Sequence, residues 1–356
     1  MAKSSQKIII IGAGLGGLTL ALSLLREGFD VTVLEQASRL GEVGAGIQIS
    51  ANGARVLHHL RLEEALTKVA FHPESGEMRH WQTGEVLITR PLGDASVKRF
   101  GFPYYHMHRA DFHGVLEAAV REAAPIAVRL NAKVARIEQD SDGVRAITAG
   151  GETVSGDVLI GCDGIHSAVR ETLFGADDPS FTGCIAWRAT IPVERVPKDH
   201  IRPVASNWIG QGGHFVHYYL RRGELVNCVG VLEGQGWSAE SWSAEGDQAD
   251  FLRDFDAWHE DLKVLIRSAE RCFRWGLFDR DPMPRWSEGR IALLGDACHP
   301  MLPFMAQGAV MGIEDAHTLM RCLQENTDPT AALRRYEDLR RERTAIVQRM
   351  ARENMT

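Results

Sequence analysis

The sequence predicts a mixed α/β fold: a parallel sheet covered by helices, interleaved with a mainly antiparallel β-sheet, and a helix at the C-terminus. Three observations lead to this prediction. The chain opens with a strand–helix–strand pattern of apolar residues. Between residues 181 and 286, apolar and polar residues alternate in several short segments, and seven of the eight tryptophans lie there. Residues 327–356 interleave basic and acidic side chains, a pattern typical of a solvent-exposed helix.

The opening segment predicts one β-α-β unit. Residues 7–11 are a β-branched run of the kind that is buried on both faces of a parallel sheet. A helix is expected from Leu15, because leucines recur at helical spacing as far as Leu25, and Gly28 ends it. Residues 30–35 form the next strand, so the connection between the two strands should be right-handed.

The remaining elements return to this alternation after long interruptions. Further strands are expected at residues 134–138, 144–148, 157–160, 186–191, 214–220, 225–231 and 290–294, and helices at 111–123, 308–323 and 330–352. We therefore expect two interleaved domains around one core. The parallel-sheet domain is assigned residues 1–70, 106–180 and 281–326, the antiparallel-sheet domain residues 71–105 and 181–280, and the C-terminal helix residues 327–356.

Composition argues against several classes of function. The chain has 40 Lys and Arg against 47 Asp and Glu, and this formal charge of −7 offers no positive field to nucleic acid or an anionic membrane. No apolar run approaches the roughly 18 residues of a membrane-spanning helix. The six cysteines are scattered without C-x-x-C spacing, which favours reduced thiols in a cytoplasmic protein. No histidine spacing typical of a metal site is present, so no metal is expected.

A glycine-rich turn at residues 12–17 joins the first strand to the first helix. Gly12 allows a tight turn, Gly14 lets the backbone approach a pyrophosphate, and Gly17 lets the helix pack closely on the strand. Glu35 ends the second strand 18 residues after Gly17, where a carboxylate can accept hydrogen bonds from an adenosine ribose. This register predicts a dinucleotide site, with a glycine-rich turn beside a surface glutamate as the alternative.

Two later motifs favour FAD over NAD as that dinucleotide. Residues 289–300 are expected to form a strand followed by a turn of small residues that contains Asp296. A carboxylate in such a turn can hydrogen-bond a polyol such as ribityl. A helix beginning at Gly308 can direct the positive end of its dipole towards a flavin carbonyl. Residues 160–170 repeat the strand–glycine turn–helix pattern and place Asp163 in the turn.

In chain order, at residues 12–17, 160–170 and 289–300, the three motifs resemble those of the single-component, flavin-dependent aromatic hydroxylases of the p-hydroxybenzoate hydroxylase type. They match the glycine fingerprint, the Asp-Gly motif and the Gly-Asp motif of that family. Residues 44–47, 108–111 and 306–309 are most similar to the branch of salicylate hydroxylase, 3-hydroxybenzoate 6-hydroxylase and 6-hydroxynicotinate 3-monooxygenase. The resemblance covers essentially the whole chain and implies a Rossmann-like FAD-binding domain interleaved with a β-sheet substrate domain.

The resemblance also implies which residues bind the cofactors. The glycine turn would contact FAD through Gly12, Gly14 and Gly17. The adenosine half would be contacted by Leu15, Glu35, Gln36 and Val134, and the region near the pyrophosphate by Arg109. Asp296 would contact the ribityl chain, and Gly308 and Ala309 the isoalloxazine. Asp163 would serve both FAD and the passage of NADH or NADPH, the implied co-substrate. This shared role explains why the chain needs no second glycine fingerprint.

Hydroxylation by a flavin C4a-hydroperoxide requires a dry site, a well-placed ring carbon and a group that helps a phenol lose its proton. The aromatic residues between 181 and 286 could supply the dry wall. Alternation along 214–219 sends His214 and Tyr218 to one face of a strand. The related hydroxylases have a His and a Tyr facing the substrate at these positions, so we expect His214 and Tyr218 to be catalytic. The alternatives are a hydrogen-bonded core histidine and an ordinary aromatic residue of the sheet.

The sequence departs from its relatives where the substrate should be recognised. The 3-hydroxybenzoate enzymes have Gln where this chain has Pro303, and the hydroxynicotinate enzymes have His at the positions of Phe304 and Gln48. Gln48, Pro303 and Phe304 are therefore expected to line a more apolar substrate site together with His214 and Tyr218. Partners for a substrate carboxylate would come from Arg188, Gln48 and His217, each with a structural alternative.

These inferences predict an FAD-dependent monooxygenase that uses NAD(P)H and O₂ to hydroxylate a small hydroxylated aromatic acid such as salicylate. It would act as a monomer or homodimer. Two alternatives stay open within flavoenzymes: an N-heteroaromatic hydroxylase of the hydroxynicotinate or urate type, and an epoxidase on the same fold. A third alternative is a flavin-binding redox sensor without oxygenase activity.

Overall fold

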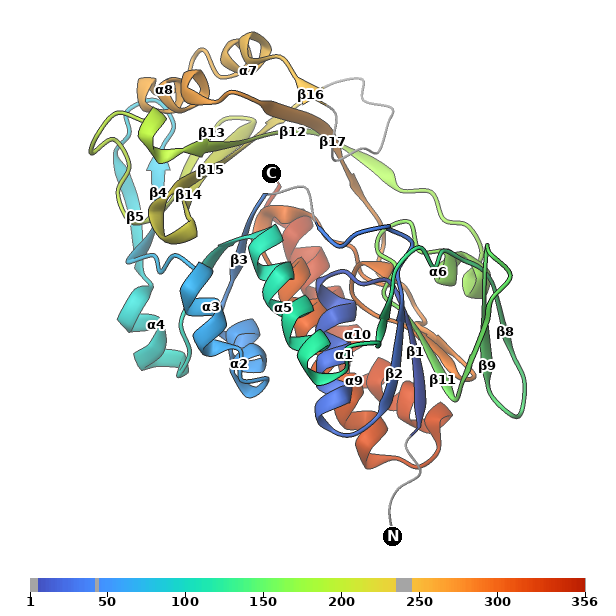
Figure 1. Ribbon diagram of the computed structural model, residues 1–356. Coiled ribbons are helices and arrows are strands. Elements are labelled where there is room, and N and C mark those ends of the chain that lie inside the picture. Colours follow the sequence, from blue (N-terminus) through green and yellow to red (C-terminus); the bar gives the residue numbers. More distant parts are fainter. Residues whose placement is uncertain (1–5, 42–44, 235–244, 356) are drawn as a thin grey trace.

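A computed structural model describes residues 6–41, 45–234 and 245–355 (Figure 1). It confirms the predicted mixed α/β class, with a largely parallel sheet in one layer and a large, mainly antiparallel sheet above it. No helix in the described residues is long and apolar enough to span a bilayer.

The parallel sheet has the strand order β18-β19-β11-β1-β2-β7, and only β18 runs antiparallel to its neighbour. Its strands are β1 (Lys7–Ile11), β2 (Asp30–Leu34), β7 (Val128–Arg129), β11 (Val158–Gly161), β18 (Ser287–Glu288) and β19 (Ile291–Leu293). Ile8, Ile9 and Ile10 are at most 1% exposed, as expected for a strand covered on both faces.

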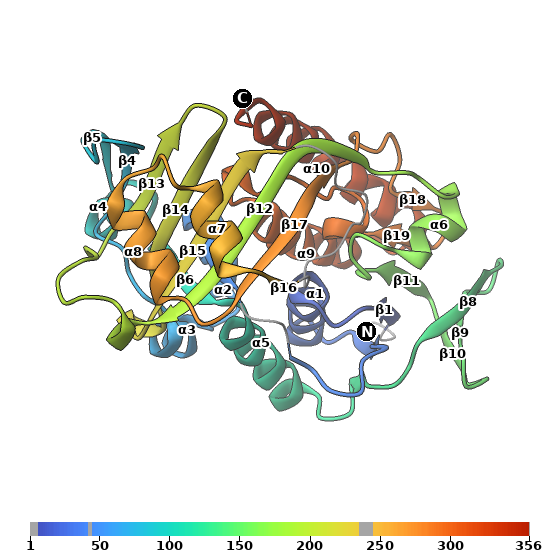
Figure 2. The same ribbon diagram turned by 90° about the horizontal axis from the view of Figure 1, so that it is seen from above.

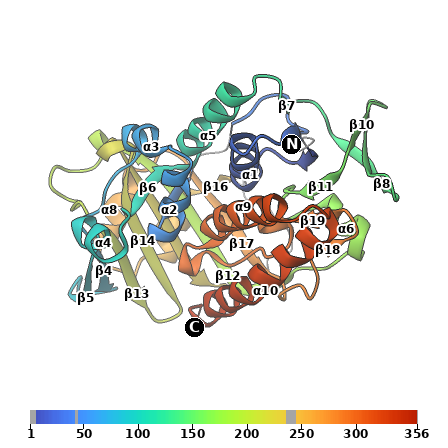
Figure 3. The ribbon, with the colours of Figure 1, turned by 90° about the horizontal axis from the view of Figure 1, so that it is seen from below.

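Helices from distant parts of the chain cover this sheet (Figure 3). They are α1 (Leu15–Arg26), α5 (Arg109–Ala123), α6 (Ala168–Phe174), α9 (Gly308–Glu325) and α10 (Pro329–Glu353). The leucines predicted to form one side of α1 lie between this helix and its neighbours, and Leu18 and Leu22 are fully buried. The core cluster of the parallel sheet includes side chains from α1, α5, α9 and α10, so the C-terminal helix belongs to the same hydrophobic core.

The second sheet has the strand order β16-β17-β12-β15-β14-β13-β4-β5, in which only β13 and β4 pair in parallel. Its strands are β4 (Ser75–His80), β5 (Val86–Pro91), β12 (Ser180–Pro192), β13 (Ala205–Gly210), β14 (Gly213–Leu220), β15 (Leu225–Glu233), β16 (Glu245–Gly246) and β17 (Cys272–Asp279). The sequence did not predict β4 and β5, because all six residues of β5 are exposed and no burial pattern marks the strand.

The two faces of this sheet have different coverings (Figure 2). On the outer face, α7 (Gln248–Asp254) and α8 (Glu260–Ser268) pack on aromatic side chains, and Trp187 stacks on Phe251 with ring centroids 4.8 Å apart. On the inner face, Trp275 belongs to an apolar cluster that also contains Ala351 of α10 and packs against Phe304. The inner face is therefore the one that meets the parallel-sheet layer.

Smaller elements complete the fold. They are β3 (Gly46–Ile49), β6 (Tyr105–His108), β8 (Val134–Gln139), β9 (Val144–Thr148), β10 (Thr153–Gly156), α2 (Ala51–His59), α3 (Glu63–Val69), α4 (Gly93–Phe100), and the 3-10 turns η1 (Val193–Arg195), η2 (Arg221–Gly223), η3 (Gly295–Ala297) and η4 (Pro303–Met305). Strands β3 and β6 pair antiparallel.

Candidate active site

The three glycine-containing motifs meet at one edge of the parallel sheet. Ile11 at the end of β1 is in register with Gly161 of β11, and Gly161 is in register with Leu293 of β19. Because these strands are parallel, the segments that follow them emerge side by side at their carboxyl ends. This edge is where open α/β sheets bind ligands.

The glycine turn at residues 12–17 has the geometry that a dinucleotide site requires. Gly12 has a φ of +100°, and a β-carbon at Gly17 would lie 2.1 Å from the Gly12 carbonyl oxygen. Both positions therefore require glycine, one for its backbone angle and one for close packing of α1 on β1. A β-carbon at Gly14 would meet no atom within 4 Å, so its backbone lies beside open space.

Two helices begin at this edge without a capping side chain. Helix α1 begins at Leu15 and α9 at Gly308, and neither helix has a side-chain cap or an acidic residue in its first turn. The backbone N–H groups of these first turns therefore present partial positive charge that no acidic residue of the same turn neutralises. Such ends suit the diphosphate and the electron-rich carbonyl edge of a flavin dinucleotide.

Glu35 and Val134 lie close together, as an adenosine site would need. The Glu35 carboxylate accepts hydrogen bonds from the backbone N–H groups of Ala13 and Ala37, both at 2.8 Å. The N–H of Ala132 donates to the Glu35 carbonyl, which brings the start of edge strand β8, at Val134, beside the end of β2. Gln36, the remaining residue predicted to contact the adenosine half, is exposed directly after Glu35.

Asp296 projects from a buried turn towards the start of α9. Gly295 and Ala297 on either side are buried, while Asp296 is exposed. One of its carboxylate oxygens lies 4.0 Å from the position of a β-carbon at Gly308. The predicted ribityl and isoalloxazine contacts, Asp296, Gly308 and Ala309, are thus brought together.

Asp163 and Arg109 occupy different positions around the same edge. The Asp163 carboxylate accepts hydrogen bonds from the Ser167 hydroxyl at 2.5 Å and the Val169 N–H at 3.1 Å, so it holds the start of α6. Burial raises its pKa. Arg109 is an exposed residue that begins α5, and its N–H donates to the Ala45 carbonyl, which precedes β3.

The alternation predicted for β14 is confirmed. Phe215 packs on Phe255 of the outer layer with ring centroids 5.3 Å apart, and His217 accepts a hydrogen bond from the Trp208 indole at 3.1 Å. His214 and Tyr218 point the opposite way, towards the parallel-sheet layer, where each meets residues from other segments.

His214 meets the loop that precedes α9. Its ring lies edge-on to Phe304 with centroids 5.4 Å apart, and Pro303 is next to Phe304 in the same 3-10 turn. Burial lowers the pKa of His214 to about 4. The imidazole is consequently neutral at neutral pH.

Tyr218 meets β3 and β6. Its ring lies 4.5 Å from that of His106, and a β-carbon at Gly46 would lie 2.6 Å from its phenolic oxygen. The Tyr104 hydroxyl donates to the Gln48 side chain at 2.7 Å. Burial raises the pKa of Tyr218, although a hydrogen bond with Gln48 opposes this rise, so the phenol stays protonated.

His106 and Asn227 belong to this cluster, and the sequence did not identify them. His106 is fully buried and neither ring nitrogen has a hydrogen-bond partner among the described residues, while burial lowers its pKa to about 3. Asn227 accepts a hydrogen bond from the Gly46 N–H at 2.8 Å. The one available signal was the alternation of residues 225–231, which places Asn227 on a defined face; strand β6 is too short to show any period.

Comparison with known proteins adds to this geometry. A family described as FAD binding domain matches residues 5–354. The chain belongs to this FAD-binding family.

Relatives share nearly the whole chain. It is 40% identical over 354 residues to 3-amino-4-hydroxybenzoate 2-monooxygenase of Streptomyces platensis (99% of this chain and 88% of that one). It is 38% identical over 356 residues to 6-hydroxynicotinate 3-monooxygenase of Bordetella bronchiseptica (99% and 92%). A solved complex of salicylate hydroxylase with its substrate superimposes with a TM-score of 0.85 at 26% identity (99% and 89%). The predicted class, a flavin-dependent aromatic-ring monooxygenase, is confirmed.

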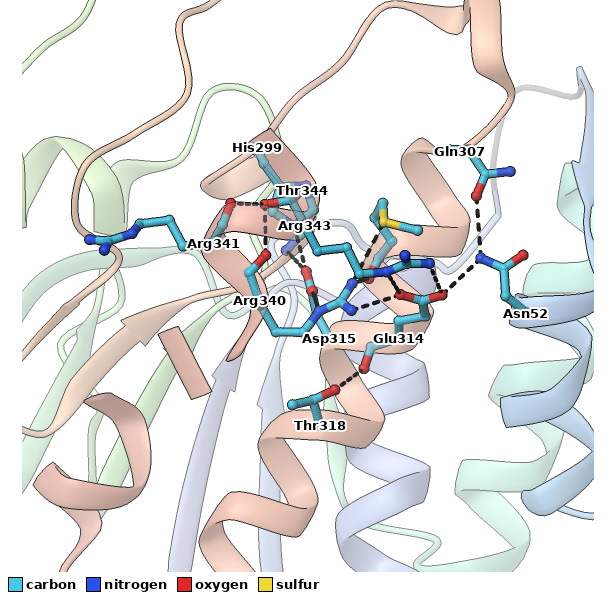
Figure 4. Close-up of polar contacts among 12 residues, drawn as sticks. Asn52, His299, Gln307, Glu314, Asp315, Thr318, Arg340, Arg341, Arg343 and Thr344 are labelled. Atoms are coloured by element: carbon cyan, nitrogen blue, oxygen red, sulfur yellow. Dashed lines mark hydrogen bonds and ion pairs between the residues drawn. The ribbon is translucent and has the colours of Figure 1, made fainter. Parts of the chain in front are cut away.

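The FAD-binding edge is tied to the C-terminal helix by a buried polar network (Figure 4). Asp315 of α9 is fully buried and accepts hydrogen bonds from His299 at 2.5 Å and from Arg340 of α10 at 2.6 Å. Glu314 accepts from Arg340 at 2.7 Å and from Asn52 of α2 at 2.8 Å. Burial alone would raise the pKa of Asp315, but the charges of His299 and Arg340 hold it below its ordinary value.

The same network includes Gln307, the residue that precedes α9. The Asn52 amide donates to Gln307 at 3.3 Å, and the Gln307 amide donates to the Ser50 hydroxyl at 3.0 Å. Gln307 immediately precedes Gly308, so the loop predicted to face the flavin is held from α2 and, through Glu314, from α10. No local sequence pattern predicts these contacts, which join segments more than 250 residues apart.

Proposed function

We propose that this monooxygenase hydroxylates a small hydroxylated aromatic acid, with NADH or NADPH as the reductant and O₂ as the oxidant. The observation that carries the proposal is the position of His214 and Tyr218. Both lie on the inner face of the large sheet and turn towards the layer that holds the FAD motifs. A proton acceptor and a phenolic donor on the flavin side suit a substrate that carries a hydroxyl group.

FAD would be held by the two uncapped helix ends, by Glu35 and Val134 at the adenosine, and by Asp296 at the ribityl chain. When bound and reduced, FAD supplies the chemistry that activates O₂ and transfers one oxygen atom. The residues named here would bind and orient this cofactor. Asp163 and Arg109 are the remaining residues that we propose to contact FAD.

His214 would accept the proton of the substrate hydroxyl. Its neutral imidazole can accept a hydrogen bond from that hydroxyl, and an anionic substrate beside it would raise its pKa again and so favour proton uptake. Tyr218 keeps its proton at neutral pH and can donate a hydrogen bond to the substrate oxygen. Positioned groups of this kind typically accelerate a reaction by about 10²–10⁴-fold.

Apolar side chains would keep water from the site. Phe304 and Met305 pack against the cluster of Trp275, Leu302 and Val231 on the inner face. Pro303 and Gln48 would complete the substrate contacts, with Gln48 held by Tyr104. Exclusion of water strengthens the polar contacts that His214 and Tyr218 make with a substrate.

A ligand screen tests the proposal. Purified FAD-loaded protein is mixed with NADH or NADPH and a panel of hydroxybenzoates and hydroxypyridines, and reductant consumption and products are measured. We expect at least one ligand to accelerate reductant oxidation and to yield the hydroxylated product. If no aromatic ligand raises oxidation above the unliganded rate, the proposal fails in favour of a redox sensor. A response to hydroxypyridines alone would favour the N-heteroaromatic alternative.

The cytoplasmic location, the monomeric or homodimeric state and the assigned domain boundaries stay predictions.

A further inference from the structure

Arg188 lies on the inner face of the large sheet, on the same face as the two proposed catalytic residues but two strands away from them. Its neighbour Trp187 stacks on the outer layer, so Arg188 faces the opposite way. Strand register aligns it, through Val229 of β15, with Val216 of β14. Val216 lies midway between His214 and Tyr218. Arg188 is therefore two strands away from them, or about 10 Å between backbones, with its long side chain on the same face.

This arginine is buried and has no anionic partner among the described residues. It is 8% exposed, and in the part of the chain that the structure describes, no carboxylate or hydrogen-bond acceptor contacts its guanidinium. The other buried arginines do have such partners: Arg170 and Arg280 contact Asp177, and Arg340 contacts Asp315. A buried charge without a partner is costly, and natural proteins usually retain one for a purpose.

Two aromatic rings support the guanidinium but do not neutralise it. Its central carbon lies 5.1 Å from the Trp275 ring and 5.5 Å from the Phe273 ring. Burial lowers the pKa of Arg188, the charge of Arg109 lowers it further, and the Tyr218 phenol acts in the opposite direction. A second cation nearby makes the region more attractive to an anion. Cation–π contacts leave the N–H fork free for bidentate hydrogen bonds.

We propose that Arg188 binds the carboxylate of the aromatic substrate. The proposal rests on the proposed function and adds to it the group that recognises the acid. Because a planar guanidinium matches a carboxylate with two parallel hydrogen bonds, Arg188 would fix the orientation of the ring as well as its charge. The substrate hydroxyl would then be directed towards His214 and Tyr218, two strands away on the same face.

FAD is a poorer occupant for this cation. The elements that suit its diphosphate, the glycine turn and the start of α1, belong to the parallel sheet. Arg188 belongs to the other sheet, where its neighbours on adjacent strands are apolar or aromatic. The proposal therefore predicts that loss of Arg188 affects the acid and leaves FAD bound.

The test compares acids with their neutral amides. Holoenzyme is titrated with 2-, 3- and 4-hydroxybenzoate and with the matching hydroxybenzamides, and the change in flavin absorbance reports binding. We expect the wild type to prefer the acid, and Arg188→Gln to weaken acid binding by about 30-fold or more with little effect on the amide. Arg188→Lys keeps the charge but loses the two parallel N–H donors, so its affinity for the acid should lie between those of the wild type and Arg188→Gln. If Arg188→Gln does not fold, the acid affinity of Arg188→Lys tests the proposal.

Arg274→Gln is the matched control. Arg274 lies on the adjacent strand β17 and contacts a tryptophan, Trp187, at the same 5.1 Å, but on the outer face. This variant should bind the acids as the wild type does. If the wild type binds acid and amide equally, or if an Arg188 variant keeps wild-type acid affinity or loses FAD, the inference is overturned. If wild-type holoenzyme binds none of the acids, the proposed function itself fails.

Discussion

Gly46 and Tyr218 are in such close contact that no side chain fits between them. A β-carbon on Gly46 would lie 2.6 Å from the phenolic oxygen and 2.8 Å from a ring carbon of Tyr218. The same glycine donates its N–H to Asn227, the register partner of Tyr218 on β15. Strand β3 thus fixes the position of a proposed catalytic side chain that is far away in the sequence.

Gly46→Ala should therefore displace Tyr218. We expect hydroxylation to fall by about tenfold or more, because a displacement of about 1 Å at a reacting group is enough to cost that much. FAD content is measured in parallel, because the neighbouring Ala45 carbonyl accepts a hydrogen bond from Arg109, a proposed FAD contact. Gly114→Ala is the control, because a β-carbon at Gly114 meets no atom within 4 Å. Equal activity of the Gly46 variant and the wild type would show that Tyr218 does not need its present position.

Arg340 connects the C-terminal helix to two carboxylates of α9. It is 5% exposed and contacts both Asp315 and Glu314. Arg340→Met should lower the free energy of unfolding by about 3–5 kcal/mol, because it leaves buried carboxylate charge without its main partner. Urea unfolding of the FAD-loaded protein measures this loss. Arg349→Met, at a half-exposed ion pair on the same helix, should cost less than about 1 kcal/mol. Similar losses for both variants would contradict a special role for the network.

Local periodicity explains what the sequence could predict. The inner and outer faces of β14 follow from alternation alone, and the glycine turn at residues 12–17 follows from steric limits on neighbouring backbone. These features depend on residues close in sequence, so they can be derived before any tertiary contact is known.

Contacts between distant segments could not be predicted in this way. Gly46 and Asn227 are 181 residues apart, and no local pattern pairs them. Arg340 lies in a helix whose sequence shows charge on every side, so its inward position is set by the packing of α10 on α9. Arg188 was one of three candidates for a carboxylate partner. It differs from His217, which faces the outer layer and is paired with Trp208, in its place on the inner face and in its burial without an anion among the described residues.

Asp296 and His214 should separate cofactor binding from catalysis. Asp296→Ala removes the exposed carboxylate beside Gly308 and should yield protein that loses FAD on gel filtration. His214→Gln should keep the yellow colour but hydroxylate about 10²-fold or more slowly, with reductant oxidation less affected than product formation. Flavin absorbance and product yield per NAD(P)H distinguish the two variants. A colourless His214→Gln protein would assign His214 a structural role.

His217 should make the folded protein sensitive to acid. Burial lowers its pKa to about 3, below the ordinary value of 6.5, and charge from Arg79 adds to the effect. Between these values the unfolded chain binds a proton that the folded protein does not, so the free energy of unfolding falls as the pH drops. We expect a loss of about 2 kcal/mol between about pH 7 and pH 5 from this residue, measured by urea unfolding. His217→Gln should reduce the pH dependence by that amount. Trp208→Phe, which removes the hydrogen bond but not the burial, should keep this pH dependence. If Trp208→Phe reduced it as much as His217→Gln does, the hydrogen bond would be the cause instead.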